Sequence, residues 1–156
     1  GYGVIDSGPG SRARLIECGV VRTPARDPLP VRLRAIRDGM MELIARHRPD
    51  AVAIEEVFYG KNVRTTVVLS HARGVILLTA QEAGVAIGEY PPALVKKTVV
   101  GRGGAAKPQV GYMVAQLLRL TAPPSPADAA DGVAVALTHH LLSGRQNFRV
   151  AERRPA

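Results

Sequence analysis

Strand-length apolar runs alternate with helical segments along most of this chain, and that alternation restricts the folds open to it. The runs at 1–5 and 14–21 flank the turn sequence Asp6-Ser7-Gly8-Pro9-Gly10 and predict an antiparallel hairpin. Further apolar runs predict strands at 51–54 and 85–90. Apolar residues at helical spacing predict helices at 33–47, 62–83, 91–99, 107–120 and 127–142. This order predicts an α/β fold in which a mixed sheet carries helices on both faces.

The charge of the chain is strongly positive. Lys and Arg number 21 against 13 for Asp and Glu, which gives a formal net charge of +8 over 156 residues. Such an excess can serve solubility alone. A basic chain that also contains a local acidic cluster instead favours binding to a polyanion such as a nucleic acid.

The cysteine content and the hydropathy pattern indicate a compartment. Cys18 is the single cysteine, so an intrachain disulfide is excluded and a reducing environment is expected. No apolar run approaches the length of a membrane span, and no signal peptide precedes the first predicted strand. We therefore expect a cytoplasmic protein that does not bind membranes.

Acidic residues follow one predicted strand and open one predicted helix. Glu55 and Glu56 come where the apolar run 51–54 stops, and Asp128 and Asp131 lie three residues apart on one helix face. Carboxylates gathered in one place are unfavourable unless a cation neutralises them, and Mg²⁺ prefers such oxygen ligands. An acidic centre in a basic chain predicts a nuclease.

Each of these acids also has an ordinary structural interpretation. Side chains alternate along a strand, so Glu55 and Glu56 point to opposite faces, and periodicity cannot choose between them as a ligand. Asp128 could cap the final helix, and Asp131 could interact favourably with the helix dipole. These interpretations explain one aspartate well and the whole set of acids less well.

Four segments along the chain form a characteristic set: Gly1-Tyr2-Gly3-Val4-Ile5, Ala53-Ile54-Glu55-Glu56-Val57-Phe58, Val95-Lys96-Lys97-Thr98-Val99-Val100-Gly101 and Ala127-Asp128-Ala129-Ala130-Asp131. In their order and spacing they resemble the RuvC family of Holliday junction resolvases. The resemblance implies a ribonuclease H-like fold with a mixed five-stranded sheet. It also implies a homodimer that cuts four-way DNA junctions with Mg²⁺ or Mn²⁺ and makes one nick per subunit. Two ions per site are expected because together they can activate the attacking water and stabilise the leaving oxyanion.

The same resemblance assigns functional residues. Glu55 matches the metal-binding glutamate of the family, and Asp128 and Asp131 match its C-terminal acidic pair. Lys96 and Lys107 match basic residues close to the scissile backbone.

The segment that follows the strand at 51–54 is expected to contact DNA bases. Phe58 matches an aromatic residue that acts on bases at the junction centre. Its neighbours Tyr59, Lys61 and Arg64 combine aromatic and basic character, which suits stacking on unpaired bases beside phosphates.

One family residue has no counterpart in this sequence. The first catalytic aspartate of the family lies in a Gly-Ile-Asp-Pro-Gly segment before the Gly-Tyr-Gly segment, whereas this chain starts at Gly-Tyr-Gly. Asp6 resembles it superficially, but its position at the end of the next strand predicts a turn residue. Either the sequence omits a stretch of the full protein, including its first strand, or this form is an inactive enzyme.

The resemblance divides the chain into a nuclease domain over 1–142 and a basic tail over 143–156, which we expect to be disordered. Two alternative functions stay open. One is a ribonuclease H-like nuclease acting on structured RNA, and the other is a junction-binding protein without catalytic activity. Docking to a branch-migration helicase complex is a further possible partnership.

Overall fold

The computed structural model describes residues 1–6, 12–57 and 63–143. Within them the predicted alternation of strands and helices is confirmed, with most boundaries within a few residues of those expected. The elements are β1 (Tyr2–Asp6), β2 (Arg14–Gly19), α1 (Leu29–His47), β3 (Ala51–Glu55), α2 (Val63–Glu82), β4 (Ala86–Tyr90), α3 (Pro92–Val100), α4 (Lys107–Leu118) and α5 (Ala127–Ser143). Across the described ranges, no helix is both long and apolar enough to cross a membrane.

The strands form two separate pairs. β1 pairs with β2 in antiparallel register as predicted, with an irregularity between Val4 and Ile5. β3 pairs with β4 in parallel register, and α2 makes the crossover that parallel strands require. The expected single five-stranded sheet is not formed: the described residues supply four strands, and no hydrogen-bonded ladder joins β1–β2 to β3–β4.

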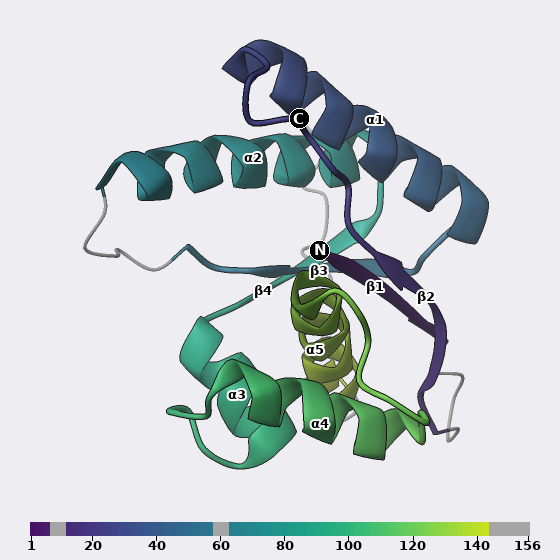
Figure 1. Ribbon diagram of the computed structural model, residues 1–156. Coiled ribbons are helices and arrows are strands. Elements are labelled where there is room, and N and C mark those ends of the chain that lie inside the picture. The colour runs from purple at the N-terminus through teal and green to yellow at the C-terminus, as the bar shows by residue number, and fades with distance from the viewer. Residues whose placement is uncertain (7–11, 58–62, 144–156) are drawn as a thin grey trace, which may run out of the picture.

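The helices lie in two layers on opposite sides of the strands. Figure 1 shows α1 and α2 on one side, and α3, α4 and α5 on the other. The core lies on the α5 side, where buried residues of α4 and α5 pack together, among them Val110, Val114, Val133 and Leu137. By contrast, α1 has no buried residue and α2 buries only Thr79 and Ala80.

Glycines allow β1 to lie directly against α5. A Cβ added at Gly132 would stand 2.6 Å from the Tyr2 Cα, and one at Gly3 would stand 2.6 Å from the Val133 Cα. Real Cβ atoms do not approach backbone so closely, so this contact requires glycine on both elements. The contact brings β1 beside the first turns of α5, where Asp128 and Asp131 lie.

Turn and cap residues end the elements where the sequence predicted. α1 ends at His47, and the next residue, Arg48, is left-handed with φ 45°, just before Pro49. Gly84, the predicted stop after α2, has φ +70°. Cys18, on β2, is partly buried and packs against the core. Asp6 closes β1 as an exposed residue 3.7 Å from Arg14, which fits its predicted place at a strand end and not a catalytic one.

Candidate active site

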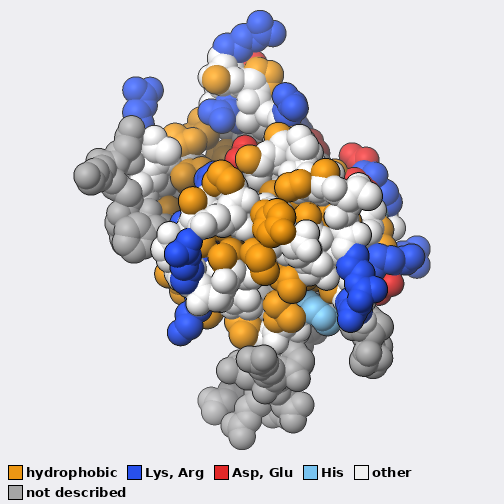
Figure 2. All heavy atoms as spheres, turned by 60° about the horizontal axis from the view of Figure 1, so that its bottom comes forward, with side chains coloured by type: hydrophobic (Ala, Val, Ile, Leu, Met, Phe, Trp, Pro, Cys, Tyr) orange, Lys and Arg blue, Asp and Glu red, His pale blue; other side chains and the backbone are white. Residues whose placement is uncertain are grey.

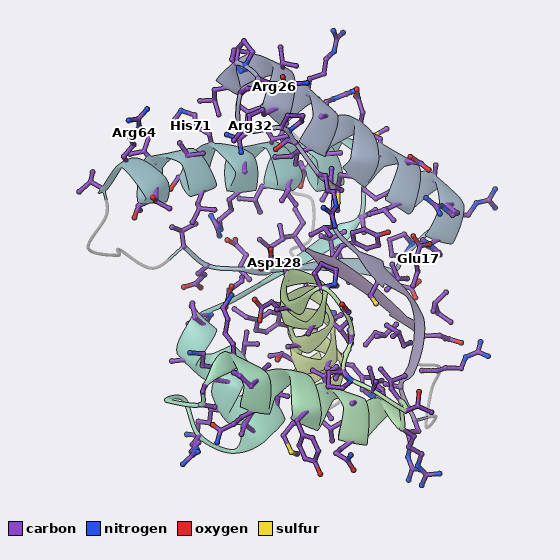
Figure 3. All side chains as sticks on the ribbon, in the orientation of Figure 1. Glu17, Arg26, Arg32, Arg64, His71 and Asp128 are labelled. Atoms are coloured by element: carbon purple, nitrogen blue, oxygen red, sulfur yellow. The ribbon has the colours of Figure 1, made fainter. Side chains whose placement is uncertain are left out.

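Helix α5 and strand β3 bring the predicted acids to one region of the molecule. Glu55 is the last residue of β3, and Asp128 and Asp131 lie in the first turns of α5. Figure 3 shows Asp128 at the start of α5, beside the strands. The apolar run before Glu55 and the buried alanines 129 and 130 anchor these backbones, while all three carboxylates stay accessible to solvent.

Lys107, the first residue of α4, interacts with both aspartates. Its Nζ lies 3.0 Å from Oδ2 of Asp131 and 3.9 Å from Oδ1 of Asp128. The hydrogen bond from Lys107 to Asp131 is the main reason that the pKa of Lys107 is raised. The shared lysine confirms that Asp128 and Asp131 lie on the same face of α5.

Glu55 belongs to the same electrostatic neighbourhood. Its pKa is raised, first because nearby protein atoms displace water from one side of the carboxylate, and second because of the negative charge of Asp131. The positive charges of Lys107 and Lys96 act in the opposite direction. Two acids from different elements and two lysines therefore act on one another across a single site.

The oxygen donors suit a hard divalent cation such as Mg²⁺ in their chemistry. Their arrangement is less complete: among the described residues, no group of three His, Cys, Asp or Glu side chains is placed to hold a metal ion. The Lys107 ammonium instead occupies the space next to the aspartate oxygens. A bound cation would compete with Lys107 for these oxygens.

Glu56 lies on the other side of the strand pair, as alternation predicts. It lines a hollow of about 340 Å³ together with residues of α2, including Thr66, Ser70 and Arg73. Arg73 also forms an ion pair with Glu89 on β4. Glu55 is thus the glutamate that faces the aspartates, and Glu56 faces α2.

The predicted DNA-contacting residues are spread over several elements. Lys96, on α3, is partly buried and close enough to Glu55 to lower its pKa, whereas its neighbour Lys97 is exposed. Arg64 lies on the outer side of α2, away from Asp128 (Figure 3). Phe58, Tyr59 and Lys61 lie outside the described residues.

A polar network centred on Glu17 lies outside the site residues predicted from the sequence. The Tyr2 hydroxyl donates to Glu17 Oε1 at 2.7 Å, His47 Nε2 lies 2.7 Å from Oε2, and Arg46 adds an ion pair at 3.2 Å. The hydrogen bonds from Tyr2 and His47 lower the pKa of Glu17. The network joins β1 and β2 to the end of α1. The hydrogen bond between Glu17 and His47 joins residues 30 positions apart, so no local pattern could reveal the network.

Figure 2 shows the face on the α3–α4 side of the molecule. Hydrophobic side chains gather near its centre, and Lys and Arg side chains stand in groups around them. A hollow of about 360 Å³ lies between α3 and α4 and is lined by Val100, Pro108, Gln109, Tyr112 and Met113. On this face the Lys and Arg side chains therefore stand in several groups and not in one patch.

Comparisons with known proteins agree along nearly the whole chain. The family model described as "Crossover junction endodeoxyribonuclease RuvC" matches residues 1–139. Proteins of that name from Parafrankia sp. and Frankia alni are 52% and 50% identical over all of this chain, which covers 87% and 79% of their lengths.

Solved structures show the same relationship. A Thermus thermophilus RuvC structure has a TM-score of 0.79 and 36% identity, covering 92% of this chain and 86% of that one. T. thermophilus RuvC in complex with Holliday junction substrate has a TM-score of 0.83 and 37% identity, covering 90% of this chain and 86% of that one. The α/β fold is therefore that of the ribonuclease H-like RuvC structures. The chain belongs to the RuvC family of crossover junction endodeoxyribonucleases.

Proposed function

We propose that this protein is a structure-selective endonuclease that resolves four-way DNA junctions by paired, metal-dependent nicks during recombination and repair. The observation that carries the proposal is the site itself: Glu55, Asp131 and Lys107 interact in a chain that matches the family model over residues 1–139. A solved relative with 37% identity was determined with a Holliday junction substrate, which supports the choice of DNA structure.

Glu55, Asp128 and Asp131 are the residues that would hold divalent cations, Mg²⁺ or Mn²⁺ and two per site. Such ions supply an activated water and stabilise the leaving oxyanion in phosphodiester hydrolysis. The carboxylates come from a strand end and a helix start, two rigid backbones that limit their movement. Their oxygen donors and mutual proximity support this assignment.

Lys107 has a second task next to these acids. Its ammonium is held at 3.0 Å from Asp131, so it is oriented before substrate arrives. When a phosphate enters, the same positive charge can stabilise negative charge on the scissile group. Lys96, which acts on Glu55 from the α3 side, is the other candidate for this function.

Binding of the junction is proposed to rely on phosphate contacts and on bases opened at the crossover. The net charge of +8 favours phosphate contacts, which position a protein on DNA without reading its sequence. Phe58 and Tyr59 would stack on unpaired bases, with Lys61 and Arg64 beside them on phosphates.

The protein is proposed to act as a homodimer, because a four-way junction needs two cuts related by symmetry. Helix α2 offers a surface for such pairing. Val63, Val67 and Leu78 are 73%, 48% and 59% exposed, and their spacing places them on one side of the helix. We also propose a five-stranded sheet, a cytoplasmic location and docking to a branch-migration helicase complex, which rest on the family resemblance.

Substitution of the acids tests the proposed function. Glu55→Gln and Asp128→Asn in the full-length protein should lower junction cleavage in Mg²⁺ by at least about a thousandfold, because each removes a charge needed for metal binding. Junction affinity, measured by fluorescence anisotropy, should change little. Glu56→Gln is the matched control and should cut at the parental rate.

The same assay separates the alternative functions. Faster cleavage of structured RNA than of a four-way DNA junction would replace the proposal with an RNA nuclease. Junction binding without nicking in either Mg²⁺ or Mn²⁺ would replace it with a binding protein.

A further inference from the structure

A partly buried hydrogen bond connects strand β4 with helix α5. The Tyr90 hydroxyl and His139 Nδ1 are 2.8 Å apart, and the two rings meet edge to face with centroids 5.9 Å apart. The Tyr90 side chain is only 5% exposed. Burial raises the pKa of Tyr90 and lowers the pKa of His139, so both groups are uncharged at neutral pH.

The surroundings fix this pair tightly. A Cβ at Gly88 would stand 2.8 Å from His139 Nδ1 and 3.0 Å from the Tyr90 hydroxyl, so β4 passes directly beside the hydrogen bond. His139 is half-buried on α5. A hydrogen bond has angular preferences that apolar packing lacks, so this contact restricts both the rotation and the sliding of α5 relative to β4.

Both partners are connected to the acidic site through rigid elements. Tyr90 is the register partner of Glu55, and the Tyr90 carbonyl accepts a hydrogen bond from the Glu56 amide at 2.8 Å. His139 follows Asp131 by eight residues on α5, which corresponds to about 12 Å along a helix. One hydrogen bond therefore joins the strand pair that presents Glu55 to the helix that presents Asp131.

We propose that Tyr90 and His139 are positioning residues that fix the separation between Glu55 and the Asp128–Asp131 pair. The proposal rests on the acidic site described under the proposed function. Catalytic groups must be held to within about 0.5 Å of their productive geometry, and a displacement of about 1 Å can lower a rate about a hundredfold. The acids themselves stand on different elements, so the contact between those elements sets their spacing.

Tyr90→Phe tests the proposal because it keeps the ring and removes only the hydroxyl. In the full-length protein, kcat for junction cleavage should fall by about tenfold or more, and KM should not change because no junction contact is touched. Tyr112→Phe is the matched control. Tyr112 is 58% exposed on α4, and its variant should cut at the parental rate.

Two substitutions of His139 separate positioning from packing. His139→Asn keeps an acceptor near the position of Nδ1 and should retain at least half of the parental kcat, whereas His139→Leu should resemble Tyr90→Phe. The double variant Tyr90→Phe/His139→Leu should be no slower than either single variant, because both remove the same bond. Additive losses, or equal losses for His139→Asn and His139→Leu, would overturn the proposal.

Backbone amide NMR shifts give a readout that does not depend on activity. Tyr90→Phe should move the amide signals of Glu55 and Asp131, and Tyr112→Phe should leave them in place. Unchanged kcat in Tyr90→Phe overturns the positioning role, even if urea unfolding shows lower stability. Suppose that Tyr90→Phe has an unchanged kcat. If Glu55→Gln also cuts at the parental rate, the proposed catalytic role of the acidic site is wrong as well. If Glu55→Gln is inactive, only the proposed positioning role is wrong.

Discussion

The two helix layers of this protein are held to the strands by different interactions. On one side, α5 packs through fully buried aliphatic residues, and glycines bring its backbone against β1. On the other side, α1 buries no residue and is tied to β1 and β2 by the polar network around Glu17. The proposed catalytic acids belong to the α5 side, and the exposed apolar residues of α2 belong to the other.

This difference matches the demands on each layer. Close packing gives the α5 side little freedom, which suits carboxylates that must keep a fixed geometry. The α1–α2 layer depends less on its own core, and it leaves apolar side chains exposed that a partner molecule can cover. The comparison predicts that equal substitutions will have unequal effects in the two layers.

The largest difference in stability is expected for leucine truncation. Leu137 on α5 is 2% exposed, so Leu137→Ala should lower the free energy of unfolding by about 2–5 kcal/mol. Leu78 on α2 is 59% exposed, and Leu78→Ala should change the free energy of unfolding by less than about 0.5 kcal/mol. Urea unfolding followed by circular dichroism measures both. Similar losses for the two variants would show that α2 is as well packed as α5.

Substituting alanine for two helical glycines should change the stability of the protein in opposite directions. A Cβ at Gly132 would overlap the Tyr2 backbone, so Gly132→Ala should destabilise the protein by about 1–3 kcal/mol. A Cβ at Gly74 on α2 would meet nothing within 4 Å, and Gly74→Ala should stabilise by up to about 1 kcal/mol through helix propensity. Thermal denaturation shows directly whether each variant is more or less stable than the parent. A stable Gly132→Ala variant would contradict the close contact between β1 and α5.

These contacts also show what the sequence could and could not predict. Apolar spacing and Pro or Gly boundaries are local, so the strands and helices were predicted close to their observed positions, from Ala51–Glu55 to Ala127–Ser143. Pairing between strands depends on distant segments, and the described residues form two separate strand pairs where the sequence predicted one sheet. Alternation placed Glu55 and Glu56 on opposite faces without saying which one faces the aspartates.

The candidate site could also be predicted only in part, because some of its contacts join residues that are distant in the sequence. The spacing of Asp128 and Asp131 predicts a shared helix face, which their common contact with Lys107 confirms. That Lys107 would bridge them from α4 has no signature in the sequence, since packing of α4 against α5 decides it. The bond between Tyr90 and His139 spans 49 residues and was likewise invisible.

A smaller effect is expected from the network on the α1 side. Glu17→Gln should lower stability by about 1 kcal/mol at pH 7, because it weakens hydrogen bonds to a charged group. The pKa of Glu17 is lowered by folding, so its contribution is complete above the unfolded value near 4.5 and is lost as the pH falls through the lower folded value. Urea unfolding at pH 7 and below pH 4.5 should therefore show a smaller decline for Glu17→Gln than for the parent. Equal declines would exclude Glu17 as a source of acid sensitivity.

The smallest change in stability is expected for a charge placed on α2. This substitution tests whether the exposed apolar residues of α2 contact a partner subunit. Val67 is 48% exposed, so Val67→Lys should alter the free energy of unfolding of the single subunit by less than about 0.5 kcal/mol. It should nevertheless shift a homodimer toward monomer in sedimentation experiments, because a lysine would be buried in the partner contact. Leu69→Lys is the matched control, since Leu69 is 53% exposed but lies on a different side of the helix. If the Val67→Lys protein stays dimeric, the subunits do not associate through this side of α2. The exposed apolar residues of α2 would then have no role in dimer formation.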